Sequence, residues 1–495
     1  MKPVFLCAAV LAGAALCGCG GKSRAAEGPG PEFFTGPLSG EISLSAYDSM
    51  TYRSFLEDAA RSFEALHPGT TVRVETFSAM PEIRRSEGDG GGPMILVLSR
   101  DDPQGRADYI SRVNTALMSG EGADLYAMDV LPLHKFVEGG QLENLEALME
   151  GDPGFNKADY RGNILEALKY RDGVWFMPTD YTFNYFAYDL TLLPETAASS
   201  FGTGKVLTAG ELLALGEQYY DGSAQIFNLP DYSPVGRPAG SLAHQVLSEN
   251  MQSYVDLENK KADFVKGGFA ELLESVRSAG EGGYVSPGVT GQENPDGLLL
   301  RQAGAEKTGR FFFKLRGNFS LASHFSRGTG RRMLMEGGGE VSDDAEEIAG
   351  IAADAGGKVP FGYSQAYGIS SGSKNKALAW AFVKFLLGEE MQLSTDMRYS
   401  ALPLNNKARE QKAELIFSGA FMGREMPPDA GSEAALKQYL AVTEELSDRI
   451  NYFPVRDTTV NDMIKAEIHY FFSGSRTAEE VAAVLQNKVD LYLNE

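Results

Sequence analysis

The stretch EISLSAYDSMTYRSFLEDAARSFEALHPGTTVRVE, residues 41–75, contains a strand, a helix and a second strand in succession. Residues 41–47 alternate apolar and polar side chains, as a partly buried strand does. Residues 51–69 follow a helical period that places four apolar side chains on one face: Phe55, Ala59, Phe63 and Leu66. The "HPG" turn ends this helix before the next strand at 71–77. This order predicts a βαβ unit, and therefore an α/β fold with a mostly parallel sheet.

Two helices further along the chain carry their own start signals. Thr208 is followed three residues later by Glu211, and Thr477 by Glu480, each before an apolar helical run. In such a capping box the two side chains bind backbone N–H groups of the first turn, which have no partner within the helix. We therefore expect amphipathic helices to begin at these two threonines.

The N-terminal residues have the layout of an export signal. Lys2 precedes an apolar run, Val4 to Leu16, that is shorter than the roughly 20 residues needed to span a bilayer. All three cysteines lie in this region, and LCGC at 16–19 resembles the bacterial lipobox, whose last cysteine is lipidated after cleavage. On this reading residues 1–18 are a lipoprotein signal peptide, Cys19 carries palmitate or similar chains as a membrane anchor, and residues 19–39 form a flexible tether. An ordinary secreted protein with chance cysteines is the alternative.

Charge and cysteine content exclude several classes of protein. The formal net charge is −22, which repels nucleic acid and anionic lipid headgroups. No cysteine follows Cys19, so the folded part has neither disulfides nor a thiolate metal site. The five histidines show no metal-binding spacing, and no acidic loop has the calcium pattern. We expect no nucleic-acid partner, no metal and no cofactor.

Six stretches, taken in order, resemble the extracellular solute-binding lipoproteins that deliver ligands to ABC importers. The resemblance is to the large family 1 group, whose better-known members bind carbohydrates. It covers most of the chain from about residue 40 and includes "SGEGADLY" followed by "GGQLENL". The matching stretches are 41–75, 112–145, 172–193, 254–264, 367–392 and 401–408.

The resemblance implies a two-lobed, type II periplasmic-binding-protein-like fold with the ligand cleft between the lobes. Lobe one is expected at 40–173 plus 368–418, and lobe two at 174–367 plus 419–495. Hinge closure would trap a small-molecule ligand, which an ABC permease would then receive. The resemblance also implies a monomeric, non-catalytic protein outside the cytoplasm, held to the bacterial cell membrane by its lipid.

An aromatic strand in the first expected crossing suits a carbohydrate independently of the family. In YTFNYFAY the strand period places Tyr181, Phe183 and Tyr185 on one face, with Asp180 just before them and Trp175 upstream. Aromatic rings cover the CH faces of a pyranose, and a carboxylate accepts hydrogen bonds from its hydroxyls. The competing interpretation is that these aromatic side chains belong to the core of a buried strand.

Further candidates stand at strand ends, because ligands of doubly wound sheets bind beyond the carboxyl ends of the strands. Tyr47 and Asp48 end the first strand, although Asp48 is equally well explained as a cap of the following helix. On the family analogy, more candidates lie near the ligand: Asp124, Asp129, Tyr363, Gln365 and Tyr367.

Enzymes and other ligands are alternatives to this interpretation. Residues 368–372 spell G-x-S-x-G, with His469 further along, but SKNK separates the serine from the next helix. A glycosidase would need a carboxylate pair that sequence cannot reveal. Within the receptor class, a polyamine would need several cleft carboxylates, and a polyol phosphate an arginine or a helix N-terminus. A sugar or oligosaccharide receptor is the leading hypothesis.

Overall fold

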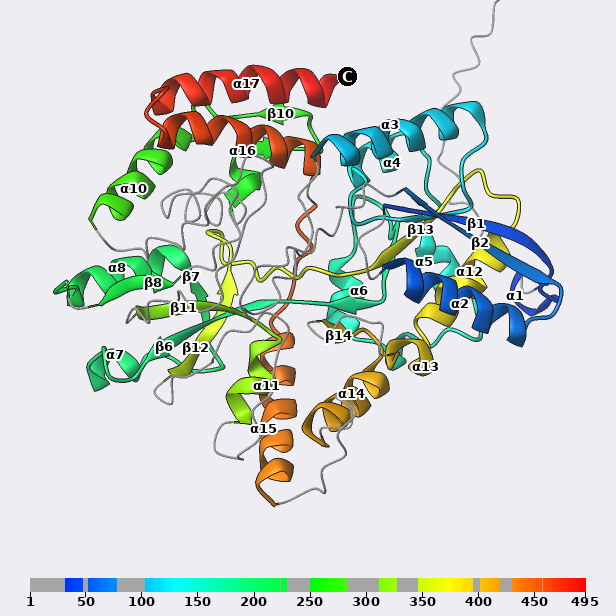
Figure 1. Cartoon of the computed structure of the whole chain (residues 1–495), viewed down its shortest axis with the longest axis horizontal. Helices are drawn as coiled ribbons and strands as arrows, with labels where there is room; N and C mark the ends of the chain where they lie inside the picture. Colours follow the sequence, from blue (N-terminus) through cyan, green and yellow to red (C-terminus); the bar gives the residue numbers. More distant parts are fainter. Residues whose placement is uncertain are drawn as a thin grey trace, which may run out of the picture.

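The computed structural model describes residues 32–47, 52–77, 103–222, 224–228, 250–282, 311–326, 346–394, 401–418, 430–455 and 457–495. The statements below concern these residues. Two predictions from the sequence, the ligand contact of Asp48 and the lipidation of Cys19, fall on residues outside the described ranges. The expected signal peptide at 1–18 also lies outside them. Figure 1 shows two sheet regions side by side, with a pair of long helices, α16 and α17, above them.

The first sheet has the strand order β2-β1-β3-β13-β4. Its strands are β1 (Gly40–Tyr47), β2 (Thr70–Phe77), β3 (Leu125–Ala127), β4 (Met177–Pro178) and β13 (Ala366–Ile369). β1 runs parallel to β2 and β3, and α2 (Tyr52–Leu66) joins β1 to β2, which confirms the expected βαβ unit. On the apolar face of α2, Phe55, Ala59 and Phe63 are fully buried, whereas Leu66 at the last turn is 61% exposed.

Helices surround this sheet and supply its core. They are α3 (Pro103–Ser119), α4 (Leu133–Glu138), α5 (Leu145–Gly151), the 3₁₀ turn Lys157–Asp159, α6 (Gly162–Ala167), α12 (Lys376–Leu386), α13 (Glu389–Gln392) and α14 (Asn406–Ser418). The face of α12 that meets the sheet is apolar, with Trp380, Phe382 and Val383 buried.

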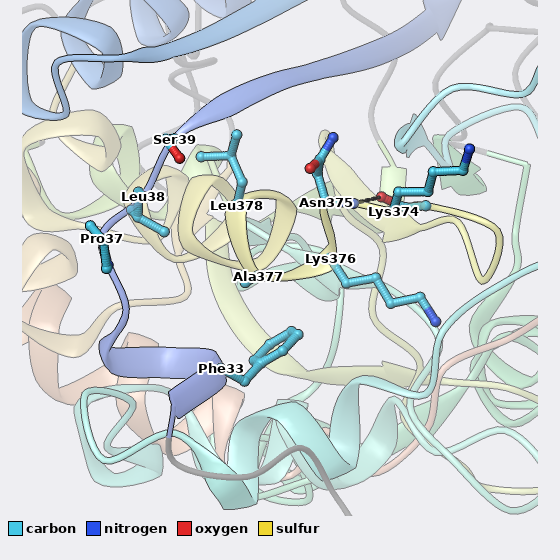
Figure 2. A pocket seen from close by; sticks show the side chains of 10 residues that line it. Phe33, Pro37, Leu38, Ser39, Lys374, Asn375, Lys376, Ala377 and Leu378 are labelled. Carbon is cyan, nitrogen blue, oxygen red and sulfur yellow. Dashed lines mark hydrogen bonds between the residues drawn. The ribbon is translucent and has the colours of Figure 1, made fainter.

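The end of the expected tether is part of the folded body. Residues 32–39 include α1 (Glu32–Thr35), and Phe33, Phe34 and Leu38 pack against the main core. Figure 2 shows the pocket formed where these residues meet the start of α12. Residues 32–39 of the predicted tether are therefore part of the folded body.

The second sheet has the order β7-β12-β6-β11-β8. Its strands are β6 (Asn184–Asp189), β7 (Val206–Thr208), β8 (Gln225–Asn228), β11 (Phe311–Gly317) and β12 (Glu346–Ala353). The central strand β6 is antiparallel to both β11 and β12. Its associated helices are α7 (Glu195–Ala198), α8 (Ala209–Tyr219), α11 (Ser320–Phe325) and α15 (Ala430–Ser447).

A separate helical unit has its own hydrophobic core. It consists of α10 (Phe269–Glu281), α16 (Thr458–Phe472), α17 (Ala478–Asn494) and the hairpin of β9 (Val255–Asp256) and β10 (Lys261–Ala262). Both capping boxes form as expected, at the starts of α8 and α17. No helix in the described part of the chain is long and apolar enough to cross a membrane.

Three segments run side by side between the sheets, and we call them the crossings: 179–183, 359–365 and 450–455. Thr182 and Gly362 exchange two backbone hydrogen bonds, of 2.8 and 2.9 Å. The Phe361 N–H donates to the Tyr452 carbonyl at 3.1 Å, which adds the third crossing. Because β4 and β13 still pair in the first sheet, the first crossing begins later than the boundary expected at 173/174, and the second ends before 367/368.

Candidate functional site

One edge of the first sheet collects the residues that follow β1, β3 and β4. β3 is parallel to β1, and β13 returns antiparallel, so the start of β13 lies at the same edge as the ends of β1 and β3. The Met128 N–H donates to the Ala366 carbonyl at 2.9 Å, and the Thr179 N–H donates to the Gln365 carbonyl at 3.0 Å. The crossings leave from this carboxyl edge, which is where ligands bind in open α/β sheets.

Three aromatic rings meet where the crossings converge, and we call them the crossing aromatics: Phe176, Tyr363 and Phe453. Their ring centroids lie 5.1 Å apart for Phe176 and Phe453, 5.4 Å for Phe176 and Tyr363, and 5.7 Å for Tyr363 and Phe453. Phe176 is buried, whereas Tyr363 and Phe453 are partly exposed. The Tyr363 hydroxyl donates to the Met128 carbonyl at 3.2 Å, which fixes the group to the carboxyl edge.

A second group, the edge aromatics, consists of Tyr47, Phe77 and Tyr109. The Tyr47 ring lies 6.3 Å from Phe77 and 5.7 Å from Tyr109. Tyr109 is buried and shares a 3.2 Å hydrogen bond with the Ser45 hydroxyl, while Tyr47 and Phe77 keep part of their surface exposed. Tyr47 and Phe77 end adjacent parallel strands, which is why they lie side by side.

Asp129 is electrostatically linked to both aromatic groups. Burial raises the pKa of the Tyr109 and Tyr363 hydroxyls, and the negative charge of Asp129 raises both further. Asp129 itself is partly exposed. The carboxyl edge thus combines partly exposed rings with the partly exposed residue Asp129, a combination suited to a ligand with apolar faces and hydroxyl groups.

Asp180 ties two crossings together. Its Oδ1 accepts a 2.6 Å hydrogen bond from the Ser364 N–H, and the side chain is buried. Lys412 on α14 is also buried and donates to the Ala401 carbonyl at 3.0 Å. Burial lowers the pKa of Lys412 to about 8, against the opposing effect of the Asp180 charge. This position suits Asp180 to holding the hinge.

Five of the expected ligand contacts lie in the core: Tyr181, Phe183, Tyr185, Gln365 and Tyr367. The Tyr181 hydroxyl donates to the Ser447 hydroxyl at 3.2 Å, and the Tyr367 hydroxyl donates to Gln365 Oε1 at 3.2 Å. Phe186, Ala187 and Tyr188 are buried as well, because β6 is the central strand of its sheet. The structure therefore places these side chains in the core, as the competing interpretation of this stretch expected.

Asp124 lies at the opposite edge of the first sheet, and the Trp175 side chain is bound by a backbone carbonyl. Asp124 precedes β3 while Asp129 follows it, and a strand rises about 3.3 Å per residue, so the two cannot share one edge. The Asp124 carboxylate accepts from the Ser43 N–H at 2.9 Å and from the Ser373 hydroxyl at 2.6 Å. The Trp175 Nε1–H donates to the Tyr170 carbonyl at 2.9 Å. Asp124 therefore lies away from the carboxyl edge, and the Trp175 side chain belongs to neither aromatic group.

The serine of the G-x-S-x-G pattern lacks the setting of a nucleophile. Ser370 is 3% exposed, and α12 begins only at Lys376. An elbow serine would stand exposed at the start of its helix. Among the residues described here, no group of three or more His, Cys, Asp or Glu side chains could hold a metal ion.

Sequence reasoning missed four of the six aromatic residues at the carboxyl edge. Phe77 could have been found, because it ends a strand parallel to the one that Tyr47 ends. Phe176, Tyr109 and Phe453 had no comparable signal, since their roles depend on contacts between distant segments.

Two sheets joined by three crossings define a two-lobed binding protein of the type II periplasmic kind. Residues 99–416, more than half of the chain, match the family model described as bacterial extracellular solute-binding protein, and the chain belongs to this family. Membership of this extracellular family places the protein outside the cytoplasm. No curated protein matches this sequence.

Solved structures share the fold at low sequence identity. An extracellular solute-binding protein family 1 from Alicyclobacillus acidocaldarius has a TM-score of 0.52 and 15% identity, covering 92% of this chain and 99% of that chain. The ABC substrate-binding protein Lmo0181 from Listeria monocytogenes, in complex with cycloalternan, has a TM-score of 0.50 and 15% identity, covering 92% and 100%. Maltose-bound MalE3 of T. maritima has a TM-score of 0.50 and 15% identity, covering 91% and 99%.

Proposed function

We propose that this protein is a receptor that captures a sugar or oligosaccharide between two lobes and delivers it to an ABC import permease. The observation that carries the proposal is the pair of aromatic groups linked by Asp129 at the carboxyl edge. Stacking on the rings would cover the apolar faces of pyranose units, and Asp129 would accept hydrogen bonds from hydroxyls. The cycloalternan and maltose named for two structures of the same fold agree with this ligand class.

The proposed contacts are Tyr47, Phe77, Asp129, Tyr363 and Phe453, all partly exposed. Asp48 remains a proposed contact because it directly follows Tyr47 in the sequence. Asp180 is proposed to hold the hinge. We propose no catalytic residue, because ligand capture requires none.

The proposed lobes keep the order of segments expected from the sequence, with the first break moved from 173/174 to the crossing 179–183 and the second from 367/368 to the crossing 359–365. A ligand that touches both lobes would favour the closed state, which the permease would recognise. We propose further that the mature protein is a monomer and is anchored through lipid on Cys19, after removal of residues 1–18. The LCGC sequence at 16–19 supports the anchor.

A polyamine is the second candidate ligand class. Asp129 lies near aromatic rings, and such rings also attract ammonium groups through cation–π contacts. The proposed contacts include two carboxylates, Asp48 and Asp129, and the neutral sugar is favoured because each buried ammonium of a polyamine needs its own partner.

A binding screen tests the proposal on the mature chain, residues 19–495, with Cys19→Ser to prevent lipidation. Thermal unfolding is measured with mono- and oligosaccharides, polyamines and polyol phosphates. A native-state ligand at a hundredfold excess over its Kd stabilises the fold by about 2.7 kcal/mol. We expect a shift with one sugar class and recovery of that sugar unchanged. A shift only with polyamines, or turnover of a glycan, would contradict the proposal.

Variants then test the site. We expect Tyr47→Ala and Phe453→Ala each to weaken sugar binding by roughly tenfold or more, because aromatic anchors carry much of a binding energy. Trp175→Ala serves as the control, since it removes a partly exposed aromatic side chain that belongs to neither aromatic group. If all three variants bind sugar with the affinity of the wild type, the ligand lies elsewhere.

A further inference from the structure

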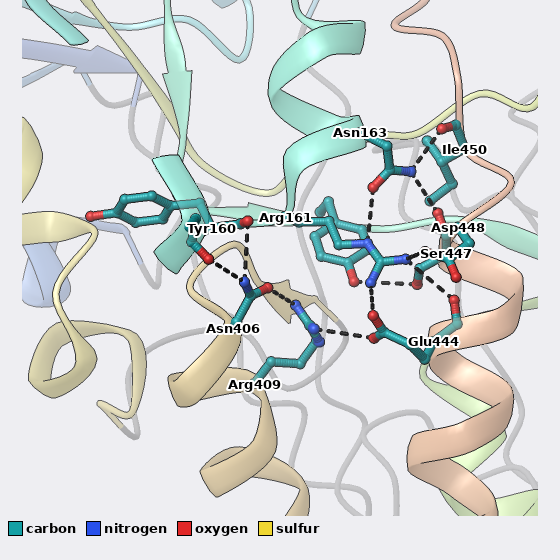
Figure 3. A network of polar contacts seen from close by, with 11 residues as sticks. Tyr160, Arg161, Asn163, Asn406, Arg409, Glu444, Ser447, Asp448 and Ile450 are labelled. Carbon is teal, nitrogen blue, oxygen red and sulfur yellow. Dashed lines mark hydrogen bonds and ion pairs between the residues drawn. The ribbon is translucent and has the colours of Figure 1, made fainter. Parts of the chain in front are cut away.

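A polar network joins α6 to the end of α15, just before the crossing that carries Phe453 (Figure 3). Arg161 precedes α6 and is 5% exposed. Its guanidinium pairs with the carboxylates of Glu444 and Asp448 and donates to the Glu444 carbonyl at 3.3 Å. The Arg161 N–H donates to the Leu404 carbonyl at 3.0 Å, which fixes the arginine to β14 (Leu402–Pro403).

Asn163 completes the contact with α15. Its Oδ1 accepts from Arg161 Nε at 2.9 Å, and its Nδ2 donates to the carbonyls of Ser447 and Ile450, both at 2.8 Å. Carbonyls at a helix C-terminus lack partners within the helix and must find them elsewhere. Asn163 therefore caps α15 from a distant part of the chain, since its two bonds join residues 284 and 287 positions apart in the sequence.

The bonds of Asn163 act close to the crossing aromatics. Ile450 is three residues before Phe453, and the intervening Asn451 and Tyr452 are hydrogen-bonded to the second crossing. The position at which the chain leaves α15 thus determines where the Phe453 ring meets Phe176 and Tyr363. Arg161 adds the charge pairing that keeps Asn163 and α15 together.

The side-chain exposures fit an anchor that acts from the first lobe. The Arg161 side chain is 6% exposed, whereas its partners Glu444 and Asp448 are 49% and 68% exposed. The buried guanidinium is held by Asn163 and the backbone N–H of Arg161 by the Leu404 carbonyl, while the acidic side chains reach the guanidinium from the end of α15. Arg409 of α14 supports the same helix through Glu444 at 3.1 Å.

We infer that Arg161 and Asn163 are positioning residues for ligand binding, which hold Phe453 in the orientation that receives a sugar ring. This inference rests on the proposed function. Neither residue touches the ligand, and both act through the end of α15 and the third crossing.

A double-mutant cycle between Asn163→Ala and Phe453→Ala tests the inference, with sugar affinity measured well below the unfolding temperature of every variant. We expect Asn163→Ala to weaken binding by roughly tenfold in the wild-type background and to have no further effect in Phe453→Ala. A merely structural role would lower the unfolding temperature and leave affinity unchanged. Should Asn163→Ala fail to fold, Asn163→Ser, which keeps a shorter donor, replaces it.

Asn406→Ala is the matched control. Asn406 also donates two bonds to carbonyls in this network, to Ala158 at 3.1 Å and Tyr160 at 3.2 Å, but it reaches α15 only indirectly, through Arg409, whose Nη1 donates to Asn406 Oδ1 at 2.9 Å. We expect its affinity to equal that of the wild type. A loss equal to that of Asn163→Ala would overturn the positioning role.

A ligand-free readout separates the two proposals. A fluorinated phenylalanine at position 453, observed by ¹⁹F NMR, should change its signal in Asn163→Ala and Arg161→Lys but not in Asn406→Ala. If Phe453→Ala weakens binding while Asn163→Ala alters neither affinity nor signal, only the inference fails. If the signal changes but no sugar binds, the proposed function fails and the role in ligand binding with it. If Phe453→Ala binds sugar normally, the inference fails while the receptor function stands.

Discussion

Glu346 shows how a single residue depends on its charged neighbours. It is 4% exposed and accepts from Arg316 at 2.9 and 3.0 Å and from Lys314 at 3.2 Å. Burial alone would raise the pKa of this carboxyl, but the bonds and charges of Arg316 and Lys314 outweigh burial and lower the pKa to about 2. The second sheet thus contains an ionised carboxylate between β11 and β12.

Replacing this carboxylate should change both stability and its dependence on pH. A lowered pKa means that the carboxylate stabilises the fold fully above its unfolded value of 4.5 and loses this effect as the pH falls toward 2. We expect Glu346→Gln to lower the unfolding free energy at pH 7 by about 3 kcal/mol, and the deficit to shrink below pH 4.5. Urea unfolding at several pH values measures this, with the exposed neighbour Glu347→Gln as control. A deficit that is independent of pH would contradict the assignment.

His134 is a second buried titratable residue. It is 2% exposed, and its Nε2 lies 3.6 Å from Asp457 Oδ2. Burial lowers the pKa of His134, while the charges of Asp457 and Glu138 oppose the shift and those of Lys135 and Lys260 add to it. The neutral imidazole is therefore the form that the fold favours.

Acidification should lower the stability of the fold, because the buried His134 resists protonation. Since its folded pKa lies below the unfolded value of 6.5, stability from His134 is complete above pH 6.5 and is lost as the pH falls below it. We expect His134→Gln to reduce the fall in unfolding free energy between pH 7 and pH 5. The matched control is His469→Gln, at an exposed position on α16. Identical pH profiles for wild type and His134→Gln would refute this prediction.

At the scale of elements, α17 shows how local and tertiary forces combine. The Thr477 hydroxyl accepts from the Glu480 N–H at 3.2 Å, and Glu480 Oε2 accepts from the Thr477 N–H at 2.9 Å. Six residues of this helix are buried in the core of the helical unit: Ala478, Val481, Ala482, Leu485, Val489 and Leu493. The capping box sets where α17 begins, and packing supplies most of its stability.

Removal of the cap should therefore weaken α17 without abolishing it. We expect Thr477→Ala to lower the unfolding free energy by about 1 kcal/mol, because a threonine N-cap contributes that much. Chemical denaturation measures the loss, and hydrogen exchange should show it in the first turn of α17. Thr196→Ala, at an exposed helical position without a cap role, is the comparison. An equal loss in both variants would argue against the cap.

At the scale of the whole molecule, the three crossings connect the sheets through few backbone bonds. Thr182 pairs with Gly362, and Phe361 pairs with Tyr452. Such a narrow connection permits one sheet to rotate toward the other, as in hinge closure. The proposed contacts lie where this rotation would bring the lobes together.

Ligand binding should therefore compact the molecule. We expect a saturating sugar identified by the screen to lower the radius of gyration in small-angle X-ray scattering. A non-binding sugar at the same concentration controls for solvent contrast. An unchanged radius at full occupancy would contradict hinge closure.

Local patterns in the sequence were sufficient to predict the βαβ opening, both capping boxes and the family resemblance. These features depend on the spacing of apolar residues along a short segment and on a threonine and a glutamate three positions apart. Tertiary contacts were therefore not needed to predict them. Tertiary structure alone decided which candidates reach the carboxyl edge. Strand direction separates Asp124 from Asp129, and burial on both faces of β6 places Tyr185 in the core. Phe453 meets Phe176 only because the crossings bring distant segments together, and no local period records such a contact.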